Sequence, residues 1–253
     1  MGPRYQLFLC VVLAATMAIS PGTSVAQTLG GSPADAQYKY STPRPPGIAS
    51  PDKVDTRFGA LTFFDGFPDK ASAEKLFDNL DFQRAVQAYL FAIPAVSQVA
   101  NRNAFRTFGP ANAVVPIFEQ LLDSRGIVLT GNDNTVYSWT WIDLTKGPTV
   151  LEVPPKVLGT ANDMWQRWVI DVGITGPDKG EGGKYLFLPP GYKGSVPSGY
   201  HVVRSPTFGL WIPWRSFLVD GNPKPGVDLV KKFTKIYPLA DAGKKHAPLN
   251  FVD

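Results

Sequence analysis

The second half of the sequence consists of short apolar runs separated by turn residues, with no long helical pattern between them. Beyond Gly126, runs rich in Val, Ile, Thr and aromatic residues alternate with clusters of Gly, Pro, Asn and Asp, which is typical of all-β structure. Parallel strands need a long crossover connection, usually a helix. Because no segment here predicts such a helix, we expect antiparallel sheets in a sandwich-like arrangement. The predicted strands cover residues 127–129, 135–143, 149–153, 165–174, 184–188, 200–204 and 208–213.

Helical patterns flank this predicted β-domain, so the fold class is mainly β with a helical lead-in. Ser72 can cap a short first helix, and a longer amphipathic helix follows, with an expected kink at Pro94. The apolar face of the longer helix is Phe82, Val86, Tyr89, Leu90, Ile93 and Val96. A third short helix is predicted over 117–122, and a last one over 227–237. We therefore expect two or three lead-in helices over 57–125, a β-domain over 126–239, and a linker-like tail over 240–253.

The N-terminus has the pattern of a secretory signal peptide. Arg4 precedes an apolar run over 7–15, and small residues at Ser24 and Ala26 suit a cleavage site. The run is shorter than the roughly 20 residues that a membrane span requires. We expect residues 1–26 to be removed and the mature protein to be periplasmic or secreted, without a membrane anchor. Residues 27–56 are rich in Gly, Ser, Pro and Ala, which predicts a disordered arm.

Composition excludes several classes of function. The one cysteine, Cys10, lies in the predicted signal peptide, so the mature chain has no disulfide, thiolate metal site or cysteine nucleophile. The formal charge of +4 becomes 4 − 1 = +3 without Arg4, and the basic residues are scattered, which argues against nucleic-acid binding. The two histidines, His201 and His246, do not suggest a catalytic triad or metal site. The glycine-rich segment 176–184 lacks the spacing of a phosphate loop and is interpreted as a strand connection. We expect no cofactor or metal.

An aromatic stripe is expected on one face of the strand over 135–143. Side chains alternate between faces of a strand, so Tyr137, Trp139 and Trp141 point the same way. The stripe can be one half of a sandwich core or a face that another domain covers, since large aromatic residues dominate cores and interfaces. The alternative is a stacking platform for a sugar or another flat ligand.

A carboxylate interrupts the apolar strand predicted over 165–174. A buried Asp171 needs a partner, and Arg204 and Arg215 lie at the ends of later predicted strands. Such a cluster more often locks a sandwich together than performs chemistry. We nevertheless treat Asp171, Arg204 and Arg215, together with the aromatic stripe, as candidate ligand-binding residues, and we assign no catalytic residue.

Several motifs, in order and spacing, resemble the bacterial domain-of-unknown-function family numbered 1254. They include Arg57-Phe58-Gly59, Thr130-Gly131-Asn132-Asp133-Asn134, Glu152-Val153-Pro154-Pro155, Gly176-Pro177-Asp178-Lys179-Gly180 and Leu188-Pro189-Pro190-Gly191-Tyr192. The resemblance runs from about Asp55 to the end of the chain. It implies a helical lead-in and an immunoglobulin-like β-sandwich, normally followed by a jelly-roll-like domain of the companion family numbered 1214. It supplies no established catalytic residues. The chain ends where relatives enter the second domain, so a truncated or split member is expected.

Three functional hypotheses follow. The leading one is a non-catalytic module that docks a companion jelly-roll domain or identical subunits through the aromatic surface around Tyr137, Trp139 and Trp141. A rival is a hydrolytic or ligand-processing cleft around Asp143, Asp171, Arg204 and Arg215, completed by a further domain. The third is a carbohydrate or small-molecule binder that uses the aromatic stripe. Burial of the stripe distinguishes them, because a packed stripe cannot serve as a platform.

Overall fold

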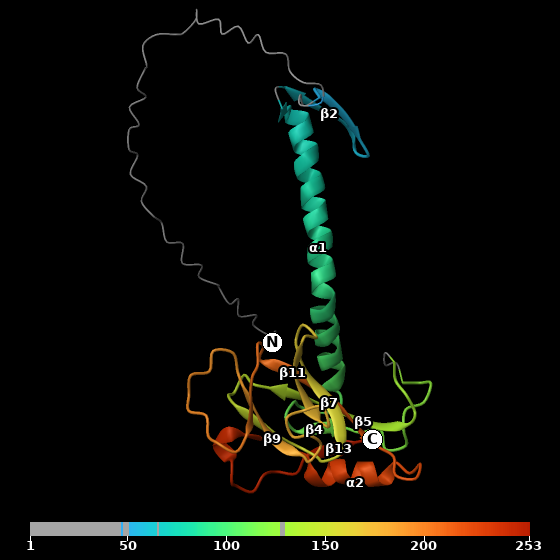
Figure 1. Ribbon diagram of the computed structural model, residues 1–253, viewed down its shortest axis with the longest axis vertical. Coiled ribbons are helices and arrows are strands. Elements are labelled where there is room, and N and C mark those ends of the chain that lie inside the picture. The colour runs from blue at the N-terminus through green and yellow to red at the C-terminus, as the bar shows by residue number, and fades with distance from the viewer. Residues whose placement is uncertain (1–46, 48–50, 65, 127–129) are drawn as a thin grey trace, which may run out of the picture. The chain divides into compact units, whose positions relative to one another are not determined.

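The computed structural model describes residue 47 and residues 51–64, 66–126 and 130–253 (Figure 1). The chain divides between Phe67 and Pro68 into two compact units. In these described parts the protein has thirteen strands and two α-helices, which confirms a mainly β fold. Most strand pairs are antiparallel, as predicted. The predicted signal peptide, most of the predicted arm and the strand over 127–129 lie outside the described residues.

The first unit contains β1 (Lys53–Thr56) and β2 (Gly59–Phe64). They belong to a small sheet of order β1-β2-β3, and β3 (Phe67–Pro68) spans the boundary between the units. Strands β1 and β2 form an antiparallel hairpin that turns between Thr56 and Gly59. The prediction of disorder is therefore wrong for Lys53–Thr56. Alternating Val and Thr in this segment match the period of a strand, which the Gly- and Pro-rich composition upstream obscured.

A single continuous helix, α1 (Lys70–Phe105), replaces the two helices predicted over its length. The side chain of Asp69 caps its N-terminus, because Oδ1 of Asp69 accepts a hydrogen bond from the Ser72 amide at 2.7 Å. Ser72 therefore lies inside the helix instead of capping it. The helix continues through Pro94.

The third predicted helix is absent from residues 117–122, and the tail is not a linker. Strand β4 (Val114–Pro116) pairs in parallel with β13 (Asn250–Val252), so the last residues belong to the folded domain. Leu249 and Phe251 pack against the main core. Ile117 continues from β4 into an isolated bridge with Ser138. The apolar residues at 117–122 serve this strand-like packing and not a helix.

Two four-stranded sheets form the body of the second unit. One has the order β5-β11-β7-β8, and the other has the order β10-β9-β6-β12. The strands are β5 (Thr135–Asp143), β6 (Thr149–Val153), β7 (Val157–Asp163), β8 (Trp168–Gly173), β9 (Gly183–Leu188), β10 (His201–Arg204), β11 (Gly209–Phe217) and β12 (Lys235–Pro238). The bounds of β5 and β6 agree with the prediction. Strands β9 and β10 are parallel, contrary to expectation, and residues 189–200 supply the non-helical crossover.

Strand β7 was not predicted, because Gly, Ala and Asn weaken its strand pattern. The packing explains this composition. A Cβ atom on Gly159 would lie 2.6 Å from the Cβ atom of Trp214 and 2.6 Å from the Pro213 carbonyl oxygen. Glycine therefore permits the close approach of β11 at Pro213 and Trp214. The loss of strand propensity is a consequence of a contact with a residue far along the sequence.

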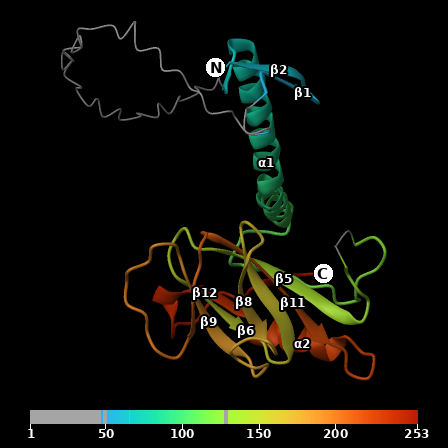
Figure 2. The same cartoon turned by 45° about the horizontal axis from the view of Figure 1, so that its top comes forward.

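The last predicted helix is too long. Helix α2 (Lys224–Phe233) ends at Phe233, and β12 follows and pairs with β6 at the edge of its sheet. Ile236 and Tyr237 therefore occupy a strand, where both are buried. Figure 2 shows α2 beside β11, and Gly226 of α2 approaches Ser216 of that strand.

The main core lies between the two four-stranded sheets, because one apolar cluster contains buried residues of both. Val136, Ile142, Leu210 and Ile212 come from the first sheet, and Leu151, Val153, Phe187 and Val203 come from the second. Val227 and Val230 of α2 join the same cluster. A smaller cluster of Val150, Leu186, Leu188 and Tyr237 lies on the other face of the second sheet.

Candidate functional site

The aromatic stripe lies on the face of the first sheet that points away from the main core. Tyr137, Trp139 and Trp141 share one face of β5, as predicted, while their neighbours Val136 and Ile142 enter the main core. The antiparallel register of β11 places Arg215 opposite Tyr137, Pro213 opposite Trp139, and Trp211 opposite Trp141. This outer face therefore carries aromatic and charged residues from two adjacent strands.

The stripe does not form a single exposed platform. Trp141 is only 1 % exposed and packs in a third apolar cluster with Phe105 of α1 and Val114 of β4. Trp139 is half-buried, and its ring lies 5.1 Å from the ring of Phe118. Stacking of a ligand on all three aromatic residues is therefore excluded. Docking of a partner on the whole stripe is excluded as well, because Trp141 is covered by the chain's own residues.

Tyr137 is the member of the stripe that borders a cavity. Its hydroxyl oxygen accepts a hydrogen bond from the Asn132 amide at 2.9 Å, which fixes the ring. The guanidinium carbon of Arg215 lies 5.9 Å from the ring centroid, within the range of a cation–π contact. Tyr137, Asp171 and Arg215 line the same pocket, which has a volume of about 420 Å³. The structure thus brings together three of the six predicted binding residues.

Asp171 has the predicted hydrogen bond, but with a different partner. The indole Nε1 of Trp168 donates to Asp171 Oδ1 at 2.8 Å. Neither arginine forms an ion pair with Asp171 within the described parts of the chain. Arg204 lies on β10 of the other sheet and donates to the Tyr192 carbonyl oxygen at 3.2 Å. Strand β7 separates Arg215 from Asp171, which explains why they do not meet directly.

Asp143 lies at another end of the sheet and holds the end of helix α1. Arg102 Nη2 lies 3.0 Å from Asp143 Oδ2. Partial burial opposes ionisation of Asp143, but hydrogen bonds from Thr145 and the charge of Arg102 outweigh it and lower the pKa of Asp143. The predicted cleft around Asp143, Asp171, Arg204 and Arg215 is therefore wrong, because only Asp171 and Arg215 share a pocket.

The glycine-rich segment connects β8 to β9, as predicted, and a buried carboxylate organises it. Asp178 accepts hydrogen bonds from the Gly173 amide, at 2.8 Å, and from the Tyr185 hydroxyl. Burial of Tyr185 and its bond to Asp178 raise the pKa of the phenol well above its usual value. His201 lies beside Tyr185, with ring centroids 5.0 Å apart. We interpret this cluster as structural, because the Asp178 carboxylate binds the chain's own Gly173 amide and Tyr185 hydroxyl.

Helix α1 carries ten of the large apolar side chains that are exposed in the described residues. We use the term α1 seam for Phe82, Val86, Tyr89, Ile93 and Val96, which have exposed fractions of 68, 41, 71, 47 and 65 %. Their spacing alternates between four and three residues, which is the pattern of a helix-pairing seam. These residues belong to the apolar helix face predicted from the sequence, and Leu90, the sixth member of that face, is exposed as well. The sequence did not predict that the chain leaves the face uncovered.

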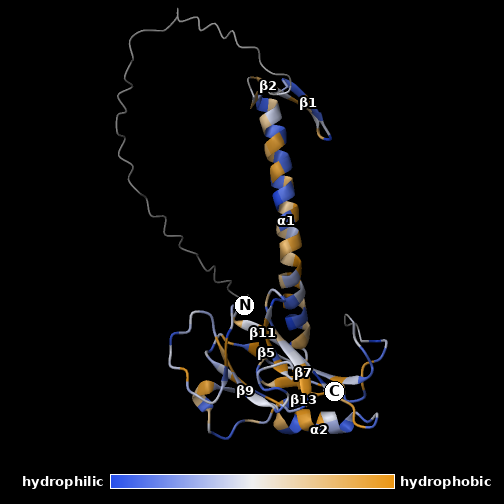
Figure 3. Cartoon of the chain, viewed as in Figure 1, coloured by the Kyte–Doolittle hydropathy of each residue, from blue (hydrophilic) through white to orange (hydrophobic). Residues whose placement is uncertain are grey.

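The residues that attach α1 to the β-domain lie on the opposite side of the helix from the seam. Gln98 donates to the Asp163 carbonyl oxygen at 3.5 Å, Arg102 pairs with Asp143, and Phe105 is buried beside Trp141. Residues advance by about 100° each around a helix, so these three positions lie roughly 120–180° from Ile93 and Val96. The attachment therefore turns the seam away from the contacts with the β-domain. Figure 3 shows apolar residues along much of the helix.

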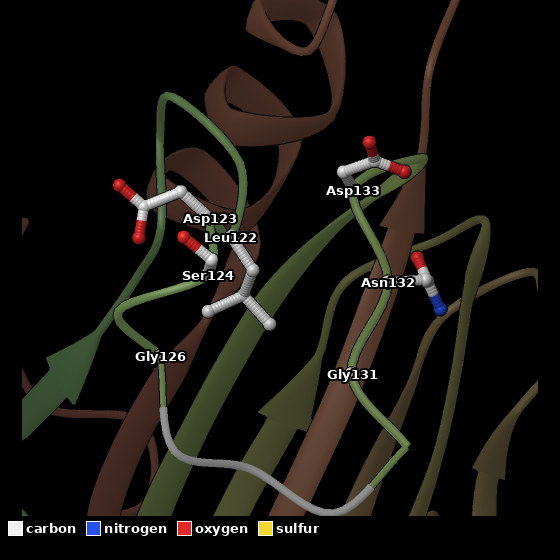
Figure 4. A pocket seen from close by; sticks show the side chains of 7 residues that line it. All are labelled: Leu122, Asp123, Ser124, Gly126, Gly131, Asn132 and Asp133. Carbon is white, nitrogen blue, oxygen red and sulfur yellow. The ribbon is translucent and has the colours of Figure 1, made fainter.

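The other candidate sites do not support the assignment of a function. A pocket of about 350 Å³ is lined by residues of two segments. Figure 4 shows Leu122, Asp123, Ser124 and Gly126 on one side and residues 131–133 on the other. Residues 127–129, which join the two sides, lie outside the described residues, so we assign no site there. Within the described ranges, no group of three His, Cys, Asp or Glu residues is placed to hold a metal ion. A search of the same ranges found no helix that is long and apolar enough to cross a membrane.

Comparisons with known proteins identify a family and no activity. The family model described as a protein of unknown function (DUF1254) matches residues 112–238. No curated protein matches the chain. The VPA0106 protein from Vibrio parahaemolyticus is 18 % identical, with a TM-score of 0.49 over 66 % of this chain and 41 % of that chain. An uncharacterised protein from Burkholderia cenocepacia is 12 % identical, with a TM-score of 0.31 over 65 % of this chain and 44 % of that chain. The match thus spans less than half of either solved chain.

Proposed function

This chain belongs to the DUF1254 family of proteins of unknown function, and we propose that it is an exported, non-catalytic module for protein assembly that self-associates through the α1 seam. The observation that carries the proposal is the exposure of the seam. Of the 36 residues of α1, only Ser72, Gln98 and Phe105 are buried. Exposed apolar surface of this extent is typical of an interaction site.

The regular spacing of the seam favours another helix as its occupant. Side chains spaced by four and three residues along one helix fit the gaps of a second helix with the same spacing. Residues 85–101 contain no Asp, Glu, Lys or Arg, so two copies can approach along this stretch without repulsion between like charges. A second copy of this chain has the same four-and-three spacing and the same uncharged stretch. It is therefore the partner that we propose, ahead of a companion jelly-roll domain.

Export and the immunoglobulin-like form of the β-domain are part of the proposal. The basic residue, short apolar run and small residues of the N-terminus support export, and a mature start at Gln27 should appear in the intact mass of the secreted protein.

The shared core between two four-stranded sheets supports a sandwich. An experimental structure that placed these sheets in another arrangement would overturn the immunoglobulin-like assignment.

Sedimentation of the mature chain at micromolar concentration tests self-association. We expect dimers or larger species for the native sequence and a monomer for Ile93→Glu, which places a charge in the middle of the seam. Gln87→Glu is the matched control. It adds the same charge to an exposed position of the same helix outside the seam, and it should leave the oligomer intact. Far-UV circular dichroism would verify that both variants keep the helix.

Other results would contradict the proposal in different ways. A native chain that remains monomeric would show that a second copy does not cover the seam. Binding of an added jelly-roll domain, or of lipid vesicles, by that monomer would identify a different occupant. Equal dissociation by Ile93→Glu and Gln87→Glu would show that charge anywhere on α1 disrupts assembly, so the seam would not be the specific contact.

A further inference from the structure

The outer face of the first sheet contains a pocket that the assembly function does not use. Its lining includes Tyr137 of β5, Leu158 and Thr160 of β7, Asp171 of β8, and Trp211 and Arg215 of β11. The volume of about 420 Å³ falls within the range of roughly 300–1,000 Å³ that is typical of small-molecule sites. The lining combines aromatic and aliphatic surface with two residues of opposite charge, which is the usual composition of a binding site for a polar ligand.

Arg215 is a half-buried cation without an anionic partner. Nothing in the described ranges places a carboxylate within ion-pair distance of its guanidinium, and its one assigned contact is with the ring of Tyr137. Because an arginine side chain is always charged, partial burial without a counter-ion is unfavourable. A planar carboxylate would satisfy the guanidinium with two parallel hydrogen bonds. The pocket therefore has an empty position for an anionic group.

Asp171 supplies an acceptor on the opposite side of the pocket. The Trp168 indole donates to Oδ1 and holds the carboxylate in place, while Asp171 has no basic partner in the part of the chain that the structure describes. A ligand can therefore donate a hydroxyl hydrogen to this carboxylate. An anionic group of the ligand cannot bind beside Asp171, because like charges repel. The two ends of the pocket thus select different groups of one molecule.

The sheet register sets the size of that molecule. Arg215 lies opposite Leu158, and Asp171 lies opposite Thr160, two residues along the same strand. With strands about 4.8 Å apart and residues about 3.3 Å apart, the Cα atoms of Arg215 and Asp171 are separated by roughly 12 Å. Both residues line the pocket, and a separation of this size together with the volume of about 420 Å³ suits a ligand of monosaccharide size. The apolar surface of Trp211 and Leu158 can contact the C–H face of such a ligand.

We propose that this pocket binds a small hydroxylated carboxylate of the sugar-acid class. The carboxylate pairs with Arg215, hydroxyl groups donate to Asp171, and the carbon skeleton lies against the aromatic and aliphatic lining. A neutral sugar would leave Arg215 unpaired. The positive charge of Arg215 would repel an amine that carries no carboxylate. The inference does not depend on self-association, since none of the pocket residues belongs to the α1 seam.

The test is a titration of the mature chain with D-galacturonate and with its uncharged counterpart D-galactose, followed by calorimetry or by NMR shifts. We expect saturable binding of the acid, at least about tenfold tighter than binding of the neutral sugar, because a charge-assisted bidentate contact is lost with galactose. Arg215→Gln should remove this preference. Arg215→Lys keeps the charge but loses the planar geometry, and should retain part of it. Asp171→Asn should weaken both ligands by a similar factor.

Arg204→Gln is the matched control, because Arg204 lies on the other sheet and outside the pocket. This variant should bind the acid like the native chain. Thermal unfolding would verify that each variant is folded. If Arg215→Gln does not fold, Arg215→Lys still tests whether the preference for the acid depends on Arg215. The proposal is overturned if galacturonate shows no saturable binding at millimolar concentration. It also fails if galactose binds equally well, or if folded Arg215→Gln keeps the preference. A monomeric chain that binds galacturonate would separate this inference from self-association.

Discussion

The two helices of this protein differ in where their apolar residues go. Helix α2 has 10 residues, and its buried positions Gly226, Val227 and Val230 face the main core. Helix α1 has 36 residues, and the large apolar side chains of its seam are exposed. Apolar content therefore does not show whether a helix packs on its own domain. Helix α2 completes a core within the chain, whereas α1 presents a surface for another molecule.

Both helices begin with a local side-chain hydrogen bond. Asp69 Oδ1 accepts from the Ser72 amide at the start of α1, and Asn222 Oδ1 accepts from the Lys224 amide, at 2.9 Å, at the start of α2. A cap stabilises the first turn of a helix independently of distant contacts. Helix α1 is therefore supported at its start by local chemistry and at its end by Phe105. Helix α2 has local support as well, but it buries three of its 10 residues against its own domain, whereas α1 buries three of its 36. Three experiments test this contrast, in order of decreasing expected effect.

The largest effect is expected where α1 is attached to the β-domain. Phe105→Ala removes a buried ring beside Trp141 and Val114 and should lower the free energy of unfolding by about 3–5 kcal/mol. Phe91→Ala is the control on the same helix, because Phe91 is 76 % exposed, and it should change this free energy little. Denaturant unfolding of the mature chain provides the measurement. Similar losses for both variants would mean that the attachment at Phe105 is not distinctive.

A matched pair of valines compares the two helices directly. Val230→Ala in α2 should cost about 2 kcal/mol, because the side chain is fully buried in the main core. Val96→Ala in α1 should leave the stability of the monomer nearly unchanged and should instead weaken self-association. Unfolding at high dilution and sedimentation at micromolar concentration measure the two effects. A large stability loss for monomeric Val96→Ala would show that the chain itself covers the seam.

The smallest effect is expected for the ion pair between Arg102 and Asp143. Because the pair is only partly buried, Arg102→Gln should cost less than about 1 kcal/mol near pH 7. The pKa of Asp143 is lowered in the folded state, so its contribution to stability is present above the ordinary carboxyl range and is lost as the pH falls through the lowered pKa. The native and variant proteins should therefore converge in stability in strong acid. A stability difference between the two proteins that stays constant over this pH range would show that the ion pair does not cause it.

Much of the fold follows from local patterns. The alternation of β5 and the apolar run of β6 predict both strands with the observed bounds, and the stripe of α1 predicts a helix face. The errors occur where distant contacts outweigh propensity. Gly159 weakens the pattern of β7 but is required beside Trp214. Residues 250–252 form a strand only because β4 lies next to them.

The candidate pocket was predicted in part. Sequence alternation placed Tyr137 on the correct face, and the carboxylate in an apolar strand marked Asp171 as unusual. Arg204 was grouped with them because it ends a strand, but that strand belongs to the other sheet. Trp211 and Thr160 were not identified. Their role depends on the order of β11, β7 and β8 in the sheet, and strand order is not a local property.

By itself, the sequence determined the family, the mainly β composition of the second unit, and the apolar face of α1, because these depend on motifs and periodicities within short segments. Only the tertiary structure decided that Trp141 is covered while the α1 seam is not. It also decided that Arg215 and Asp171 share a pocket without pairing. The physical reason is that burial and charge pairing depend on which strands become neighbours. That choice is made by the packing of the whole domain and not by any segment alone.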